Sequence, residues 1–368
     1  MQNQEVLRNK PLSYEASKAV LKSLSLETRE AINRRIPALR TVNSRLPYVL
    51  ENVRIGAKYF QTNGREWVMK PVWVQSSDYP LRQVVDPEKT EVVIHQTTQN
   101  SDNPLNKVVG QRKRTATIRQ NKPRKETYYR VNKSHEEILE KLFDEYVKNG
   151  TVVRGSLCFG GIPKFLRRRR ENERELKIKV ANLELTVYAP NDYDQFFGFI
   201  DMDVLENVRI FEIRSSLTLL DNPEIKTCKN LTIYSRYLVT PNNISIDQLV
   251  RLRNQHLKLE IISFTLHELQ LYVQDWITTG REIGTRFTWE TVPSVNVLPI
   301  LEDLKTHLGA DEAGSHLDYY FSDKTIHGNG ITLKMGEDRE LVMYCGKNKT
   351  QFEMEVVSST TATDIVPT

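Results

Sequence analysis

The sequence is poor in cysteine. Its 368 residues contain three, Cys158, Cys228 and Cys345, and no two of them lie near each other. This number and spacing argue against a disulfide framework, and there is no CxxC pair for zinc. We therefore expect reduced, apolar cysteine side chains that serve packing.

Long apolar runs are also missing. No stretch approaches the ~20 residues that a membrane-spanning helix needs. The polar segment Met1–Lys10 lacks the apolar core of a signal peptide. We therefore expect an intracellular protein, cytoplasmic or nuclear, with no membrane partner. Apolar residues make up 39% of the chain and charged residues 27%, which is enough for real cores beneath a charged surface.

Motifs for catalysis and for metal binding are lacking. The seven histidines form no pair with one another or with cysteine at metal-ligand spacing. The sequence has no P-loop, no GxSxG elbow and no HExxH helix. The aspartates between 192 and 203 flank a short predicted helix, where capping and solvation explain them. We therefore predict no enzymatic activity and no cofactor.

A short phrase recurs in the middle third of the chain. Asn182–Leu185 reads Asn, apolar, polar, apolar, and the same pattern returns at 207–210 and 230–233, after 25 and 23 residues. Such alternation places the apolar side chains on one face of a strand. A period in the low twenties is typical of leucine-rich-repeat solenoids, in which each repeat contributes one strand. The polar positions of the phrase would then face outward, as a binding surface or as plain solvated positions: Glu184, Arg209 and Thr232.

The alternation of strands and helices around these phrases predicts right-handed βα units with a largely parallel sheet. The expected fold class is α/β, with a small helical start, an irregular leucine-rich-repeat-like βα sheet or solenoid, and a β-rich end. The predicted divisions are an F-box-like helical segment at 11–45, a short β-hairpin region at 46–75, a basic flexible linker or loop at 76–133, a repeat domain at 134–292, a helix with antiparallel strands at 293–357, and a disordered tail at 358–368.

Local signals place several elements. Asn63-Gly64 predicts a hairpin turn, because both positions tolerate positive φ. Thr28–Ile36 predicts a short helix that turns Arg29 toward solvent. Helices are also expected at Ile246–Asn254 and, with a clear apolar side, at Leu266–Trp276.

Basic residues are concentrated in one segment. From Lys107 to Lys133 there are ten Lys and Arg against one acid, although the net charge of the whole chain is only +5. Two clusters stand out: Arg112, Lys113 and Arg114, then Lys122, Arg124 and Lys125. Such clusters occur in solvated linkers, nuclear-import signals and phosphate-binding patches. The alternative function is therefore a nucleic-acid-associated protein that binds through residues 107–133.

The opening of the chain resembles a large nematode family of uncharacterised F-box-like proteins. The resemblance rests on Pro11-Leu12-Ser13-Tyr14, on Val20-Leu21 and on the run from Arg35 to Arg40. Residues 256–290 are similar to the F-box-associated regions of that family, through the strand 257–261, the helix that ends at 274–277, and Gly280.

This resemblance implies a modular recognition protein. The F-box-like segment would dock on the Skp adaptor of a cullin–RING ubiquitin ligase, and the repeat domain would select an unknown protein substrate. The adaptor would contact apolar positions: Leu12, Leu21, Leu24 and Ile32. An F-box usually ends with a tryptophan, whereas the first one here is Trp67. The alternative is that the same helices cap the open end of the repeat domain.

Overall fold

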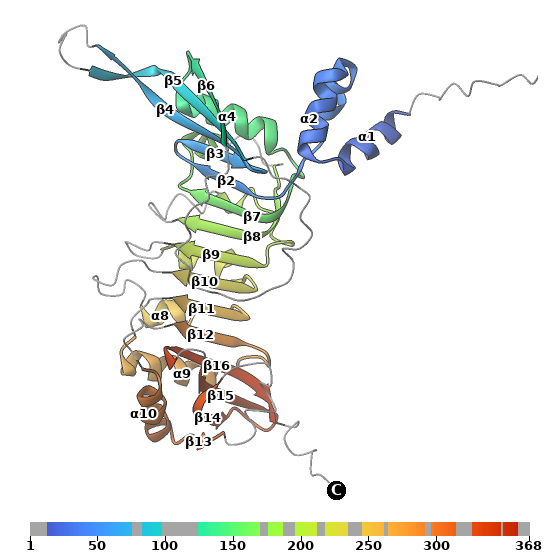
Figure 1. Cartoon of the computed structure of the whole chain (residues 1–368). Helices are drawn as coiled ribbons and strands as arrows, with labels where there is room; N and C mark the ends of the chain where they lie inside the picture. The colour runs from blue at the N-terminus through green and yellow to red at the C-terminus, as the bar shows by residue number, and fades with distance from the viewer. Residues whose placement is uncertain are drawn as a thin grey trace, which may run out of the picture. The chain divides into compact units, whose positions relative to one another are not determined.

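The chain divides into two compact units. Unit 1 comprises Met1–Ser156 and Pro163–Val180, and unit 2 comprises Leu157–Ile162 and Ala181–Thr368. The architecture is mixed α/β, as the sequence predicts (Figure 1). The computed structural model describes residues 13–75, 83–97, 124–169, 176–186, 196–211, 218–234, 245–260, 264–290, 296–313, 326–346 and 349–359.

Unit 1 begins with short helices. They are α1 (Tyr14–Ser23), α2 (Leu26–Arg35), the 3-10 turn η1 (Pro37–Leu39) and α3 (Arg40–Ser44). The Oγ of Ser13 accepts a hydrogen bond from the backbone N–H of Ala16 at 3.2 Å, which starts α1. Ser25 starts α2 in the same way through the N–H of Thr28. Helices therefore fill the described part of the predicted segment 11–45.

Arg29 is buried, and the prediction that it faces solvent is wrong. Only 1% of its surface is exposed. Its Nε donates to Asn43 Oδ1 at 2.7 Å, and its Nη1 donates to the carbonyl of Pro47 at 2.8 Å. The guanidinium also lies over the ring of Tyr48, 4.1 Å from the centroid. Helical periodicity marks this position as polar, but the chain that follows α3 supplies acceptors that a guanidinium can satisfy together.

The sheet of unit 1 is mainly an antiparallel meander. Its strands are β1 (Val49–Leu50), β2 (Val53–Gly56), β3 (Tyr59–Thr62), β4 (Arg65–Gln75), β5 (Gln83–Thr97), β6 (Arg124–Val131) and β7 (Val152–Gly160), with the last residues of β7 assigned to unit 2. The same unit holds the helices α4 (His135–Tyr146) and α5 (Lys164–Arg169). The strand order is β7-β2-β3-β4-β5-β6, and β1 pairs with β7 in parallel. The predicted hairpin turn is confirmed, because Asn63 and Gly64 join β3 to β4 with φ of 48° and 76°.

Residues 83–97 and 124–131 form strands within the segment 76–133, where the sequence predicts a loop or linker. These strands are β5 and β6, and β5 pairs with β4 on one side and β6 on the other. Residues 76–82 and 98–123 lie outside the described residues. Charged residues obscure the alternation in β5, although Val92 and Val93 are buried. The pairing of β5 with β4 and β6 outweighs its weak local preference for strand structure.

An aromatic cluster forms the core between the sheet of unit 1 and α4. The rings of Phe60 and Trp67 lie with their centroids 5.8 and 5.3 Å from that of Tyr146 on α4. The hydroxyl of Tyr146 donates to Glu30 Oε1 at 3.0 Å, and Arg65 contacts both oxygens of Glu30 at 3.0 Å. Burial and the Glu30 charge together raise the pKa of Tyr146. This polar triad joins α2 to the sheet and to α4.

The strands of unit 2 include a parallel run. They are β8 (Lys179–Thr186), β9 (Asn207–Phe211), β10 (Asn230–Tyr234), β11 (His256–Glu260), β12 (Arg286–Glu290), β13 (Asp311–Glu312), β14 (His327–Lys334), β15 (Arg339–Cys345) and β16 (Gln351–Ser358), with the first residues of β8 assigned to unit 1. β8 to β12 pair in parallel, which confirms the predicted parallel sheet. β16 pairs antiparallel with β12, and β15, β14 and β13 follow it in that order.

The helices of unit 2 connect these strands. They are η4 (Thr218–Asp221), α7 (Pro223–Thr227), α8 (Ile246–Leu249), α9 (Leu266–Thr279) and α10 (Leu298–Leu308). α9 contains the predicted helix Leu266–Trp276 and ends at Gly280, whose φ of 67° suits a left-handed cap. α8 is shorter than predicted, and the carbonyls of Val250 and Leu252 beyond its end accept hydrogen bonds from the side chains of Arg253 and Arg281.

The apolar side chains of the parallel strands point to one face and form the core of unit 2. Those of the central strands are fully buried: Leu183, Leu185, Val208, Ile210, Leu231, Ile233, Leu257, Leu259, Phe287 and Trp289. Tyr272 of α9 contacts Phe287 of β12, with ring centroids 4.9 Å apart. α9 therefore packs on this face at β12, and the other face of the same strands carries the polar residues.

Candidate protein-interaction surface

Polar side chains lie in rows across the second face of β8 to β12, which we call the polar face. The in-register pairing aligns one residue from each strand in each row. The first row is Asn182, Asn207, Asn230, His256 and Arg286. The second row is Glu184, Arg209, Thr232, Lys258 and Thr288. The third row is Thr186, Phe211, Tyr234, Glu260 and Glu290. Glu184, Arg209 and Thr232, which the sequence places outward, are thus neighbours.

The first row begins with a ladder of side-chain amides. Asn207 Nδ2 donates to Asn182 Oδ1 at 2.7 Å, and Asn230 Nδ2 donates to Asn207 Oδ1 at 2.7 Å. A slip of one residue in the pairing would turn every amide to the opposite face of the sheet. The ladder therefore supports the register on which the other rows depend, and it gives the recurring asparagine a physical role.

Charged pairs occupy the second and third rows. Lys258 Nζ lies 2.7 Å from Glu260 and 3.3 Å from Glu290. Burial lowers the pKa of Lys258, but the hydrogen bond and charge of Glu260 and the charge of Glu290 outweigh it, so the net shift is upward. Arg209 Nη1 lies 4.0 Å from Glu184, and the Arg209 side chain is 60% exposed. Solvent therefore reaches the polar face.

Two aromatic rings and a shallow pocket complete the polar face. Phe211 and Tyr234 lie with ring centroids 5.9 Å apart and planes tilted by 57°. A pocket of about 310 Å³ lies over β10, β11, β12 and the start of β16. Its polar lining combines amides, hydroxyls and basic groups: Asn230, Thr232, His256, Lys258, Arg286, Thr288 and Gln351. Aromatic rings set among mixed polar groups are typical of protein-binding surfaces.

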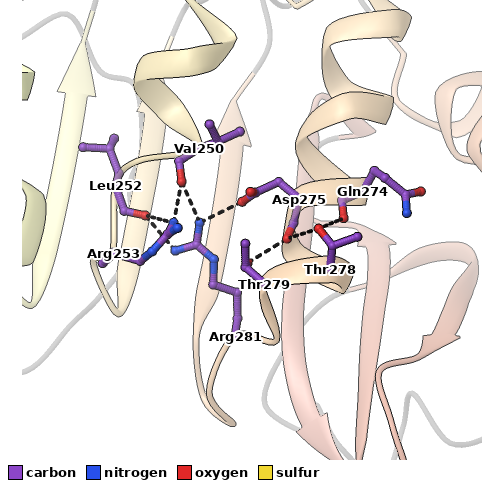
Figure 2. Close-up of polar contacts among 8 residues, drawn as sticks. All are labelled: Val250, Leu252, Arg253, Gln274, Asp275, Thr278, Thr279 and Arg281. Carbon is purple, nitrogen blue, oxygen red and sulfur yellow. Dashed lines mark hydrogen bonds and ion pairs between the residues drawn. The ribbon is translucent and has the colours of Figure 1, made fainter.

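Arg281 fixes the loop that leads into β11. Its side chain is 7% exposed. Its Nη1 donates to the carbonyl of Leu252 at 2.7 Å, and its Nη2 donates to the carbonyl of Val250 at 3.4 Å and to Asp275 Oδ2 at 3.2 Å (Figure 2). Burial lowers the pKa of Arg281. Through these contacts the end of α9 holds the start of β11 in place, and with it Lys258 and Glu260.

The residues predicted to contact an adaptor lie in different surroundings. Leu21 is 2% exposed and packs inside unit 1. Leu24 and Ile32 are half-buried, and Leu12 lies outside the described residues. The apolar side chains that this segment exposes are others: Tyr14, Val20 and Ile36. Leu21 is therefore unsuited to direct contact with a partner.

Most of the predicted basic patch lies outside the described residues, namely Arg112, Lys113, Arg114 and Lys122. Arg124 and Lys125 begin β6. Nucleic-acid binding through residues 107–133 stays a prediction. Within the described residues, no group of three or more His, Cys, Asp or Glu is placed to hold a metal ion. No helix in that part of the chain has the length and apolarity to cross a bilayer.

The sequence analysis does not predict the ion pairs that Lys258 of the second row forms with Glu260 and Glu290 of the third row. A signal for them exists, because 256–260 and 286–290 repeat the polar–apolar alternation of 230–234. Aligning these segments places Tyr234, Glu260 and Glu290 at equivalent positions. The different first residue, which is His or Arg in place of Asn, concealed the match.

Comparison with known families adds one result. Residues 131–292 match a family model, Domain of unknown function (DUF3557). The matched region runs from the last residue of β6 to just beyond β12 and so includes every strand of the polar face. No curated protein and no solved structure matches the chain.

Proposed function

We propose that the chain is a protein-interaction scaffold, which acts by binding and not by catalysis. Its polar face is the recognition surface. The observation that supports this proposal is the in-register array of charged, amide and aromatic side chains on parallel strands. Side chains on several rigid neighbouring strands suit the recognition of a large partner better than a small substrate.

We propose that the parallel part of unit 2 is a short, irregular leucine-rich-repeat-like sheet. The phrase spacing of 25 and 23 residues and the amide ladder support this assignment. A second buried amide, on Asn254, donates to the carbonyls of Ile225 at 2.8 Å and Cys228 at 2.7 Å. It ties the turn before β11 to the turn before β10, so each repeat is braced by its neighbour.

The helical segment 13–45 would then dock on a Skp-type adaptor, which would make the scaffold a substrate-recognition subunit of a cullin–RING ubiquitin ligase. The exposed apolar side chains of Tyr14, Val20 and Ile36 support this role, since an adaptor would bury them. If the helices serve only as a cap, no adaptor is needed.

Capture of the full-length chain on an immobilised Skp-type adaptor tests this role. We expect the unmodified chain to bind, and Val20→Asp to weaken binding by about tenfold or more, because it places a charge in the contact. Lys22→Asp is the matched control, since residue 22 points about 200° away from residue 20 around the helix. Leu21→Asp would disrupt unit 1 itself. An unmodified chain that the adaptor does not retain rejects the adaptor role.

The polar face has a test of its own. Affinity purification of the full-length chain, followed by mass spectrometry, should recover a partner that Arg209→Glu no longer recovers. Arg209 is exposed, so this change leaves the fold intact. Equal recovery by both chains would reject the polar face as the recognition surface.

A further inference from the structure

We propose that the polar face takes an extended segment of a protein partner, and that its third row holds a lysine or arginine side chain of that segment. This inference rests on the proposed function and names the chemistry of the partner.

The third row joins aromatic rings to carboxylates. Register places Phe211 beside Tyr234, Tyr234 beside Glu260, and Glu260 beside Glu290. Neighbouring strands lie about 4.8 Å apart, so one long side chain can reach a ring and a carboxylate together. Rings attract cations through their faces, and carboxylates accept strong hydrogen bonds from ammonium and guanidinium groups. The row therefore suits a basic side chain.

The charges of the third row do not cancel. Among the described residues, Lys258 is the basic group in contact with Glu260 and Glu290, so one ammonium faces two carboxylates. Arg286 lies on the same strand as Glu290, but its guanidinium pairs with Glu353. Arg209 pairs with Glu184 in the second row. Glu290 is 45% exposed and can accept a second cation from a partner.

The pocket next to Lys258 suits a peptide backbone. It lies on the first and second rows. Its basic lining residues are His256, Lys258 and Arg286, of which Lys258 and Arg286 are already paired with carboxylates. The rest of its polar lining is the hydroxyls of Thr232 and Thr288 and the amides of Asn230 and Gln351. These groups both donate and accept hydrogen bonds, as the peptide N–H and C=O groups require. A phosphate backbone would meet the carboxylates of the third row and be repelled. An extended basic polypeptide fits both parts of the surface.

The experiment measures fluorescence anisotropy of labelled decapeptides mixed with the full-length chain at low salt. The peptides share Gly/Ser spacers and differ only in carrying arginine, glutamine or glutamate. We expect the arginine peptide to bind about tenfold more tightly than the glutamine peptide. Equal binding of these two peptides, or binding of neither, would overturn the inference.

Variants of the chain test whether the arginine peptide binds at the third row. Glu260→Gln combined with Glu290→Gln should weaken binding of the arginine peptide by about tenfold. Glu282→Gln removes the same charge at an exposed position of unit 2 and should leave binding unchanged. Lys258→Met should tighten binding, because it frees both carboxylates, and a damaged fold would not produce this gain. Weaker binding of the arginine peptide by Lys258→Met would contradict the proposal.

Failure of this inference can be distinguished from failure of the proposed function. A chain that captures the adaptor, and recovers a partner through Arg209, but shows no preference for the arginine peptide rejects only this inference. Selective binding of the glutamate peptide that Lys258→Met abolishes would assign the polar face to an acidic partner instead.

Discussion

A buried arginine supplies several hydrogen-bond donors from a single position in the sequence. Arg29 and Arg281 each bind main-chain carbonyls of a loop that has left a helix. A guanidinium has five donors in a rigid fork, so it can satisfy acceptors that point in different directions. Removing such a group takes away several buried hydrogen bonds at once, and the cost exceeds that of losing an exposed charge.

Arg281→Met should therefore lower the free energy of unfolding by about 2 kcal/mol, because Asp275 loses its donor and the carbonyls of Val250 and Leu252 keep only Arg253 as a side-chain donor. Arg281→Lys should recover little, since an ammonium cannot form the fork. Urea denaturation followed by tryptophan fluorescence measures the change. Arg251→Met, at a side chain 61% exposed, is the control and should shift stability by less than about 0.5 kcal/mol. An unchanged urea midpoint for Arg281→Met would show that these contacts contribute nothing.

Cys228 gives the stability of unit 2 a dependence on alkaline pH. Burial raises its pKa from 9.0 to about 12, against the hydrogen bond from Asn254 that lowers it. The folded state therefore keeps the thiol proton above pH 9, while the unfolded state releases it, so stability falls as pH rises from 9 toward 12. Between pH 9 and 10, the free energy of unfolding should fall by about 1 kcal/mol less in Cys228→Ala than in the unmodified chain, as measured by urea titration at each pH. An equal fall in the free energy of unfolding in Cys228→Ala and in the unmodified chain would contradict the prediction.

At the scale of elements, the amide ladder supports the pairing of β8, β9 and β10. Asn207 takes part in both of its hydrogen bonds, as donor to Asn182 and as acceptor from Asn230. Asn207→Ala should destabilise the chain by about 1–2 kcal/mol, since two bonds in a partly buried row are lost. Asn329→Ala, at an exposed position in β14, is the control. Equal stability of the two variants in thermal unfolding would remove the ladder as a source of stability.

Elements with strong local signals were predictable and those without were not. The turn at Asn63-Gly64 and the helix α9 follow from residue types within a few positions of each other. β5 lacks such a signal, because charges interrupt its alternation, and its residues become a strand through pairing with β4 and β6. α8 ends before the predicted Asn254, and the carbonyls of Val250 and Leu252 that follow it bind Arg281, which is distant in sequence.

At the scale of the whole molecule, stability should be greatest at the centre of the parallel run. β10 and β11 have a paired neighbour on each side, and Leu231, Ile233 and Leu259 are almost completely buried. β13 ends the strand order of unit 2, and both of its residues are exposed. Hydrogen exchange followed by mass spectrometry should find the slowest amides in β10 and β11 and fast exchange in β13. Faster exchange in β10 than in β13 would contradict this order.

The sequence by itself determined the class of the fold and the outward positions of the repeated phrase. Both follow from alternation and from a period of 25 and 23 residues, which act through short-range geometry that any strand obeys. Only the tertiary structure decided that Arg29 and Leu21 are buried and that Lys258 pairs with Glu290, which lies on the next strand. The physical reason is that burial and ion pairing depend on which distant segments meet, and local propensity carries no information about that meeting.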